Sequence, residues 1–545
     1  MIMLLYNKYI IFFKRKLIFY YNFILLMYKS IILRFHLSFD NKYFNLLTNF
    51  KVPSKNQNNG FVLIQLIEDF EFAIKIGAAA NALSKKYDCN INTFDCYWDV
   101  RLNKPNFQRF FNFFNISTPI QRFYKNFGGK IVFNNSSLYK DQSFILKRTN
   151  EIYESLNSTS DILNIKIDEI LIGDLIYDSY LRYYHQPTII KINTDVKYLI
   201  RITLDIYFSF KDFINTNKVN ALVQAYTTYI THGITARLCL NSGIKVYCIA
   251  SDSYILQEIT KDFPYHGINH TNFTSHSHFK KEDLDNSKNL LEFRFSGGVD
   301  SATSYMKNSS YFASNNYERL NILFQKKERN IIIYTHDFFD SPHINRMLQF
   351  DDLYKFLDDT LIYLNNISNT NVFIKIHPNG IHGADEIAKN LVLKFNNSNF
   401  YILDKDVSNL DIVRLKPDLI GTARGTIGIE MAYFSIPVVA LYDNIYINYD
   451  FVHSCRSKEE YFKILAGEST AICNFNKDNI YKFYYQAYLE KRKSDVDKIL
   501  KKIKFNNIDT YSKEYIQQLN KNVTSFEIDQ LKYLYTNTLA GYENN

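Results

Sequence analysis

The strongest cluster of potentially reactive residues follows two short apolar runs in the second half of the chain. His377-Pro378 comes directly after the run 371–376, and a loop of small and polar residues, 421–426, follows the run 418–420. A loop that opens a helix offers free N–H groups and the positive end of the helix dipole to a phosphate. Threonine hydroxyls and a guanidinium add further donors. The predicted anion site consists of His377, Pro378, Gly421, Thr422, Arg424, Gly425 and Thr426.

Glu430 lies about one turn into the helix that this loop opens. Its carboxylate could accept hydrogen bonds from sugar hydroxyls, as a carboxylate does with a ribose. His377 could donate to the phosphate or to a leaving group. The structural alternative is a capped helix with a core-facing Glu430 and a histidine packed beside Pro378.

A second candidate site is the segment 336–343, His-Asp-Phe-Phe-Asp-Ser-Pro-His, which follows the run 330–335. Two histidines and two aspartates at a strand end suit an acid/base pair, substrate hydroxyls or a metal ion. We take His336 and Asp340 as catalytic candidates and expect no metal. The alternative is a turn at Ser341-Pro342 whose phenylalanines pack into the core.

The first half of the chain offers weaker candidates. Asp69 follows the apolar run 61–67, and Asp178 lies in the segment 173–182. Either carboxylate could deprotonate an acceptor hydroxyl, although an exposed structural position is the commoner fate of such a residue. The candidates for contact with an acceptor are Tyr177, Tyr229 and His232.

One motif indicates a different chemistry. The residues Ser296-Gly-Gly-Val-Asp300-Ser301 match the loop with which ATP pyrophosphatases hold pyrophosphate. The preceding residues 290–295 are expected to form a strand that carries Glu292 and Arg294. No ordered series of α/β units like that of this family follows. We interpret the motif as a turn, with a nucleotide loop as the alternative.

Apolar runs alternate with helical patterns along most of the chain. The expected strands are 61–67, 221–224, 245–249, 330–335, 371–376, 399–403, 418–420 and 437–442, and the clearest helices are 353–364, 385–395 and 425–434. This alternation predicts an α/β protein with two doubly wound, Rossmann-like domains, whose ligands would sit beyond the carboxyl ends of the strands. The expected divisions are a helical apolar-basic segment 1–50, domains 51–310 and 311–475, and C-terminal helices 476–545.

Composition excludes several classes of protein. The chain has 545 residues, 46% hydrophobic and 22% charged, with a net charge of +9. These values are those of a multidomain globular protein and exclude wholesale disorder, collagen-like repeats and a multi-span membrane protein. The small charge excess predicts no nucleic-acid partner. Six cysteines without metal-type spacing favour a reducing, cytoplasmic location.

The first 36 residues are apolar but contain basic residues such as the cluster Lys14-Arg15-Lys16. No uninterrupted run reaches the ~20 apolar residues of a spanning helix. Two interpretations remain open. The segment could dock on the inner face of the cytoplasmic membrane through its basic and aromatic side chains, or it could be a helix packed on the body of the protein.

The second half also shows a family resemblance. Lys375-Ile-His377-Pro378, the segment 421–430 and Pro437-Val-Val-Ala resemble the donor-binding half of GT-B glycosyltransferases. The nearest group is the enzymes of bacterial capsule and surface polysaccharides, which include Kdo-transferring and sialic-acid-polymerising members. The segments 173–178 and 336–340 also resemble parts of capsule-region proteins. The resemblance covers about residues 330–443 and extends only loosely to the first half.

The resemblance implies that His377, Thr422 and Thr426 contact the phosphate of a nucleotide donor. Arg424 departs from the family pattern, in which we would expect a small residue. The implied activity is metal-independent transfer of a sugar from a nucleotide-sugar donor to a saccharide or lipid-linked acceptor. The donor would bind the second domain and the acceptor the first, and the nucleotide-sugar is a co-substrate rather than a cofactor.

Other functions stay open at this point. The same anion site would serve transfer of a polyol phosphate from a CDP-linked donor. The chain could also be a non-catalytic sugar-nucleotide-binding or scaffold protein of a polysaccharide export complex. An ATP pyrophosphatase that uses 296–301 is the remaining alternative.

Overall fold

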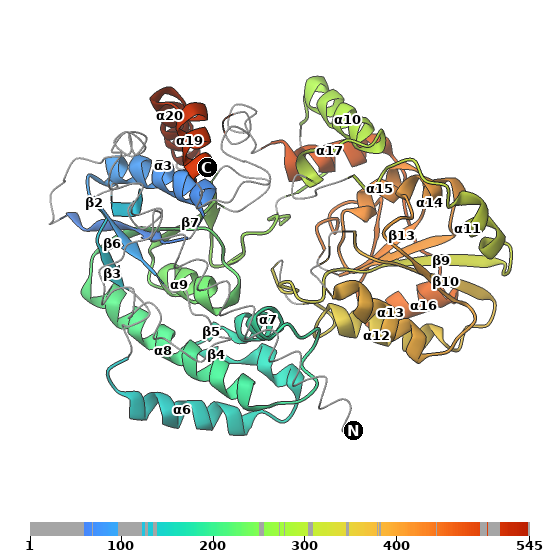
Figure 1. Ribbon diagram of the computed structural model, residues 1–545, viewed down its shortest axis with the longest axis horizontal. Coiled ribbons are helices and arrows are strands. Elements are labelled where there is room, and N and C mark those ends of the chain that lie inside the picture. The colour runs from blue at the N-terminus through green and yellow to red at the C-terminus, as the bar shows by residue number, and fades with distance from the viewer. Residues whose placement is uncertain are drawn as a thin grey trace.

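A computed structural model gives the structure of the protein. It describes residues 59–67, 69–95, 123–125, 129–133, 139–249, 256–271, 273–276, 278–303, 309–344, 348–378, 380, 383–442, 444–490, 499 and 513–542. The expected N-terminal segment 1–50 lies outside these residues. Figure 1 shows two lobes, each built around its own sheet.

The first domain contains a six-stranded sheet with the order β3-β2-β1-β6-β7-β8. Its strands are β1 (Phe61–Gln65), β2 (Asn90–Phe94), β3 (Ile131–Phe133), β6 (Val219–Gln224), β7 (Lys245–Cys248) and β8 (Gln257–Ile259). All neighbouring pairs are parallel except β7 and β8, which are antiparallel. The central strands read as continuous apolar runs because helices cover both faces of the sheet.

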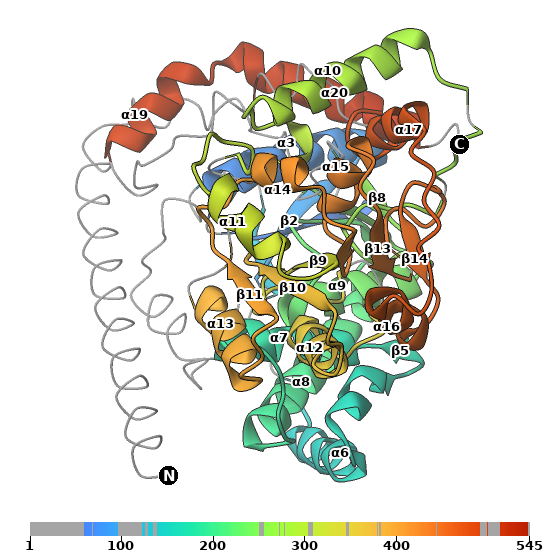
Figure 2. The same cartoon turned by 90° about the vertical axis from the view of Figure 1, so that its right-hand side faces the viewer.

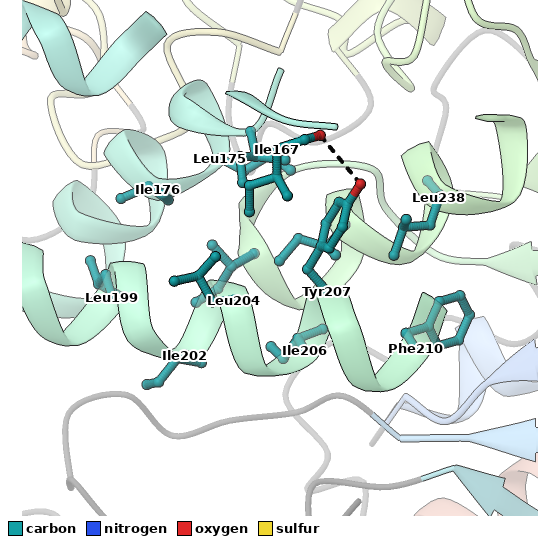
Figure 3. Close-up of a cluster of buried hydrophobic side chains, with 14 of the residues drawn as sticks. Ile167, Leu175, Ile176, Leu199, Ile202, Leu204, Ile206, Tyr207, Phe210 and Leu238 are labelled. Carbon is teal, nitrogen blue, oxygen red and sulfur yellow. Dashed lines mark hydrogen bonds between the residues drawn. The ribbon is translucent and has the colours of Figure 1, made fainter. Parts of the chain in front are cut away.

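The helices of this domain are α3 (Phe70–Tyr87), α6 (Gln142–Ser155), α7 (Gly173–Tyr184), α8 (Thr194–Thr216) and α9 (Tyr229–Asn241), with a short hairpin, β4 (Lys166–Ile167) and β5 (Ile170–Leu171). Helix α8 begins at Asn193, whose side chain accepts from the backbone N–H groups of Asp195 and Val196. Figure 3 shows its apolar side chains packed against those of α7 and α9, where the Tyr207 hydroxyl donates to the Ile167 carbonyl at 3.2 Å. Each buried apolar side chain of this kind stabilises the fold by about 1.5–3 kcal/mol.

The second domain contains another six-stranded sheet, with the order β11-β10-β9-β12-β13-β14 and all strands parallel. Its strands are β9 (Arg329–Tyr334), β10 (Thr370–Lys375), β11 (Phe400–Leu403), β12 (Leu419–Thr422), β13 (Val438–Leu441) and β14 (His453–Cys455). Its helices are α10 (Lys281–Phe295), α11 (Tyr317–Phe324), α12 (Leu353–Leu364), α13 (Ala384–Lys394), α14 (Asn409–Leu415), α15 (Ile427–Tyr433), α16 (Lys458–Ala466) and α17 (Lys477–Tyr488).

Both sheets have the doubly wound strand order 3-2-1-4-5-6, counted along each domain. The predicted fold class is therefore confirmed. In such a sheet the strand order reverses at one point, and ligands bind beyond the carboxyl ends of the two strands that meet there. These two strands are β1 and β6 in the first domain and β9 and β12 in the second.

The expectation of a strand at 290–295 is wrong. These residues are the last turns of α10, whose buried Leu291 belongs to the core of the second domain. Helix α10, which the expected division places in the first domain, therefore packs on the core of the second. The period of apolar residues in so short a run does not distinguish a strand from a helix.

The C-terminal helices return to the first domain. Helix α20 (Ser525–Gly541) packs on α3, and Ile528, Leu531 and Tyr535 share its core. Figures 1 and 2 both show α20 beside α3, with α19 (Lys513–Asn522) next to it along the chain. Among the described residues, no helix has the length and apolar character needed to span a membrane.

Candidate functional site

The point where strand order reverses in the second sheet carries His336, which follows β9, and Thr422, which ends β12. The His336 Nε2 and the Thr422 hydroxyl are 3.1 Å apart, and the same hydroxyl accepts from the Gly425 N–H at 3.2 Å. A Cβ at position 425 would lie 3.2 Å from that hydroxyl and 3.3 Å from the His336 ring, so glycine allows this close approach. Burial lowers the pKa of His336 to about 3, with His377 and Arg424 adding to the effect, and the imidazole is therefore neutral.

Arg424 lies in the same loop and is only partly exposed. Among the described residues, its guanidinium has neither a hydrogen-bond acceptor nor an ion-pair partner. Burial lowers its pKa to about 10, although the charges of Asp178 and Asp340 act in the opposite direction. A half-buried guanidinium with free donors is costly in the absence of an anion and well suited to hold one.

His377 follows β10, the strand beside β9. Its backbone N–H donates to the Thr335 hydroxyl at 3.0 Å, which fixes the start of the loop, and Pro378 continues the turn. Burial lowers the pKa of His377 as well. Three neighbouring strand ends thus bring together His377 and Arg424 of the predicted anion site and His336, which was expected to be catalytic.

Glu430 has a different environment from the expected sugar-binding one. Its carboxylate is buried and accepts from Tyr311 at 2.8 Å, Arg294 at 3.1 Å and, at 3.3 Å each, Asn409 and Thr426. These donors occupy both oxygens, so the carboxylate holds α10 and α15 together. The Thr426 hydroxyl is likewise directed to Glu430 and not to the anion site.

The 296–301 loop is a structural turn. The Asp300 carboxylate accepts from Arg294 at 2.8 and 2.9 Å and from Tyr484 at 2.6 Å, and all three side chains are buried. Gly297 has a φ of 100° at the end of α10, a conformation that favours glycine. The motif follows a helix, and its carboxylate is already paired, so the nucleotide-loop alternative does not fit the structure.

Residues 336–344 and 348–352 of the second domain, which we call the interdomain arm, contact the first domain. At its start is His336 of the anion site, and four polar contacts and one ring contact follow along it. They are His185–Phe339, stacked at 3.8 Å, Tyr229–Asp340 at 3.1 Å, Asp178–His343 at 2.6 Å, Ser160–Asp351 at 2.6 Å and Tyr177–Asp352 at 2.7 Å.

Asp340 is the exposed carboxylate of the arm. Its Oδ1 accepts from the Tyr229 hydroxyl at 3.1 Å and from the Ser341 N–H, while no described residue binds its Oδ2. Its charge raises the pKa values of Arg424, His377 and His266 against the lowering effect of burial. Asp340 therefore lies near the anion site and also near the first domain.

Three candidates from the first domain have structural contacts. The Asp69 carboxylate caps α3 by accepting from the N–H groups of Glu71 at 2.8 Å and Phe72 at 3.2 Å. Tyr177 is fully buried and donates to Asp352. Asp178 is buried against His343, and the carboxylate of Asp178 raises the pKa of that histidine although burial alone would lower it. The structure thus gives Asp69 a capping role and Tyr177 a buried contact with the second domain.

His232 lies where β1 and β6 end, at the corresponding point of the first sheet. Its Nδ1 is 2.6 Å from the Gln65 amide nitrogen, and burial lowers the pKa of His232 to about 3. His266 lies nearby, with its Nδ1 bound by the Thr227 N–H at 3.1 Å. Sequence reasoning missed His266 because no motif or periodic pattern marks the polar stretch around it.

A cavity of about 350 Å³ lies elsewhere on the second domain. Ser296, Tyr311, Phe312, Asp411 and Arg414 are among the residues that line it. It is adjacent to the Glu430 network and contains none of the histidines at the two sheet ends.

Comparison with known proteins gives distant likenesses only. No family model matches the chain, and no protein of curated function matches it. KpsC of Thermosulfurimonas dismutans, a beta Kdo 2,4 transferase, is 11% identical, with 50% of this chain and 79% of that chain covered and a TM-score of 0.30. A glycosyltransferase from Rickettsia africae is 11% identical, with 81% of this chain and 98% of that chain covered and a TM-score of 0.28. MurG of Acinetobacter baumannii is 10% identical, with 81% of this chain and 98% of that chain covered and a TM-score of 0.26.

The strand orders and connections described above carry the assignment of fold. The chain has two doubly wound, Rossmann-like domains and a C-terminal helix that returns to the first of them, the arrangement of a GT-B fold.

Proposed function

We propose that the protein is a glycosyltransferase of bacterial surface polysaccharide assembly. It transfers a sugar from a nucleotide-sugar donor to a saccharide or lipid-linked acceptor. The donor phosphate binds at the switch point of the second sheet, and the acceptor binds at the end of the first sheet. The surface-polysaccharide assignment rests on the motif resemblance of 375–378 and 421–430.

The single observation that carries the proposal is Arg424. Its partly buried guanidinium forms no ion pair with a described residue and lies near His336, which in turn contacts the Thr422 hydroxyl. A phosphate would supply the missing charge and accept from the guanidinium. The same contacts would stabilise the negative charge that develops on the nucleotide phosphate as the sugar leaves.

Asp340 is our candidate for the general base. Transfer to a hydroxyl requires removal of its proton as the new glycosidic bond forms. The Asp340 carboxylate is exposed, is held by Tyr229, and has Oδ2 free of any described partner. Asp178, another aspartate of this region, is buried and paired with His343, so it orients the arm.

A polyol-phosphate transferase with a CDP-linked donor would use the same anion site and is the second candidate. The two activities differ in the bond that breaks. A glycosyltransferase breaks the bond between sugar and phosphate, so its nucleotide product is CMP from a CMP-sugar and a nucleoside diphosphate from a UDP- or GDP-sugar. A polyol-phosphate transferase breaks the bond between the two phosphates of CDP-glycerol and releases CMP. The donor that is consumed, together with the nucleotide that is released, therefore decides between them.

The test incubates the purified protein with CMP-, UDP- and GDP-linked sugars and with CDP-glycerol, and measures nucleotide release by chromatography. We expect release from one sugar nucleotide. Asp340→Asn should slow release by about 10²–10⁴-fold, the usual contribution of general base catalysis, with nucleotide affinity retained.

Asp285→Asn is the matched control, since Asp285 is exposed on α10 and distant along the chain from both sheet ends. It should leave the rate unchanged. An Asp340→Asn rate equal to that of the wild type would remove Asp340 from the mechanism, and release of CMP from CDP-glycerol would favour the second candidate.

A further inference from the structure

The carboxyl end of the first sheet holds a polar cluster that the anion site does not use. The rings of His232 and His266 both contact the Tyr226 ring edge-on, with centroids 5.5 and 5.4 Å from it. His266 also lowers the pKa of His232, so the two imidazoles lie near each other in one cluster with Tyr226. His266 is more than nine-tenths buried, and His232 is partly exposed.

Hydrogen bonds fix the tautomer of His266. The backbone N–H of Thr227 points at its Nδ1 at 3.1 Å, and a backbone N–H can only donate. The Nδ1 must therefore be the unprotonated acceptor, and the proton of the neutral ring is on Nε2. Burial, which lowers the pKa of His266 to about 4, keeps the ring neutral.

Hydrogen bonds fix the tautomer of His232 in the same way. The amide of Gln65 is oriented by the Ala225 N–H, which donates to its Oε1 at 3.3 Å, so the amide nitrogen faces His232. This nitrogen can only donate, and the His232 Nδ1 accepts at 2.6 Å. His232 is thus also neutral, with its proton on Nε2.

Each ring consequently presents an N–H donor on the edge opposite the one that the protein holds. Among the described residues, neither Nε2 has a hydrogen-bond partner. Other contacts hold the surroundings in place, because the Gln224 amide nitrogen donates to the carbonyls of Tyr226 at 2.6 Å and of His232 at 3.1 Å. The donors are fixed and uncharged.

Uncharged donors select uncharged acceptors. A carboxylate or phosphate would lose its hydration here without gaining a cation, and the charge of Asp340, which acts on His266, would repel it. Hydroxyl and amide oxygens of a sugar lose far less on desolvation and accept from N–H groups readily. The Tyr226 ring supplies the apolar wall that a sugar ring also needs.

We propose that Tyr226, His232 and His266 form a binding site for a neutral saccharide, to which the two imidazoles donate through Nε2. The identity of this saccharide as the acceptor rests on the proposed function. In that role, the site would hold a sugar hydroxyl near Asp340, whose charge acts on His266.

The experiment uses the full-length protein without nucleotide and measures sugar binding by saturation-transfer NMR. The probes are methyl β-galactopyranoside and N-acetylglucosamine, with glucuronate as the charged counterpart. We expect a neutral sugar to bind and glucuronate to bind at least about tenfold more weakly.

Two substitutions of His266 distinguish the loss of its Nε2 donor from the loss of the structural contact that its Nδ1 makes with Thr227. In His266→Asn, the amide oxygen replaces Nδ1 and still accepts from Thr227, but nothing replaces Nε2. In His266→Gln, the amide nitrogen can reach the Nε2 position. We expect His266→Asn and His232→Asn to weaken sugar binding by about tenfold or more and His266→Gln to retain most of it.

His276→Asn, at an exposed histidine outside the cluster, is the control and should bind the sugar like the wild type. The inference is overturned if the wild type binds no neutral sugar, prefers glucuronate, or retains its affinity in both Asn variants. Sugar binding without nucleotide binding would support the saccharide site and contradict the proposed glycosyltransferase function. Nucleotide binding without sugar binding would support the proposed function and contradict the saccharide site.

Discussion

Arg424, which we propose binds a phosphate, should also lower the stability of the ligand-free protein. Its half-buried charge lacks an acidic partner among the described side chains, which is unfavourable in the free protein. Replacing it with methionine keeps the stem and removes the charge. We expect Arg424→Met to raise the free energy of unfolding of the ligand-free protein by about 1 kcal/mol, measured by urea denaturation.

Arg414→Met is the matched control, because the Arg414 side chain is exposed and its only ion pair among the described residues is a long one of 4.0 Å to Asp411. Its effect should stay within about 0.5 kcal/mol. A loss of stability in Arg424→Met larger than that of the control would show that Arg424 has a structural partner, contrary to our interpretation.

At the scale of single residues, the sequence predicted which polar residues lie at strand ends better than which residues they contact. His336, His377 and Thr422 lie at strand ends, and their positions follow from the alternation of strands and helices. The pairing of Glu430 with Arg294 could not be predicted, because 136 residues separate them and their contact depends on how α10 packs. His266 lies outside any helix or strand, so the alternation of strands and helices does not indicate its position.

Among the elements, α10 and the 296–301 loop illustrate why a short motif needs its structural context. The motif matches a nucleotide loop, but it follows a helix and its aspartate neutralises a buried arginine. Local sequence could not show this, since Arg294, Asp300 and Tyr484 converge only after α17 packs on α10.

The buried contacts of Asp300 with Arg294 and Tyr484 should contribute strongly to stability. Asp300→Asn leaves the Arg294 charge with only Glu430 as a carboxylate partner, and we expect the free energy of unfolding to fall by about 3 kcal/mol. Urea denaturation measures it. Ser296→Ala, at an exposed hydroxyl of the same loop, should change stability by no more than about 0.5 kcal/mol. A stable Asp300→Asn protein that has lost ATP hydrolysis would instead support the pyrophosphatase alternative.

For the molecule as a whole, the interdomain arm makes stability depend on pH. The carboxylate of Asp178 raises the pKa of His343, against the effect of burial and of Arg424, and Asp174 adds to the increase. A histidine whose folded pKa lies above its unfolded value stabilises the fold fully below about pH 6.5 and loses that contribution as the pH rises through the folded pKa. Burial also raises the pKa of Asp178. A carboxyl whose folded pKa lies above its unfolded value likewise makes the fold less stable as the pH rises.

We therefore expect the urea midpoint of the wild type to fall between pH 6.5 and the folded pKa of His343. Each unit of difference between the folded and unfolded pKa corresponds to about 1.4 kcal/mol. His343→Gln should flatten this dependence. His453→Gln, which removes a histidine paired with Glu460 inside the second domain, should leave the slope of the wild type unchanged. An identical slope in His343→Gln would contradict the role of the arm.

The measurement that tests the central claim most directly is calorimetric titration of the protein with CMP, CDP, UDP, GDP and ATP, repeated with Arg424→Met. We expect one nucleotide to bind, with an affinity that falls by roughly 10–100-fold in the variant, the contribution of a charge-assisted hydrogen bond. Failure of every nucleotide to bind the wild type, or equal affinity in Arg424→Met, would contradict a donor site at the end of the second sheet.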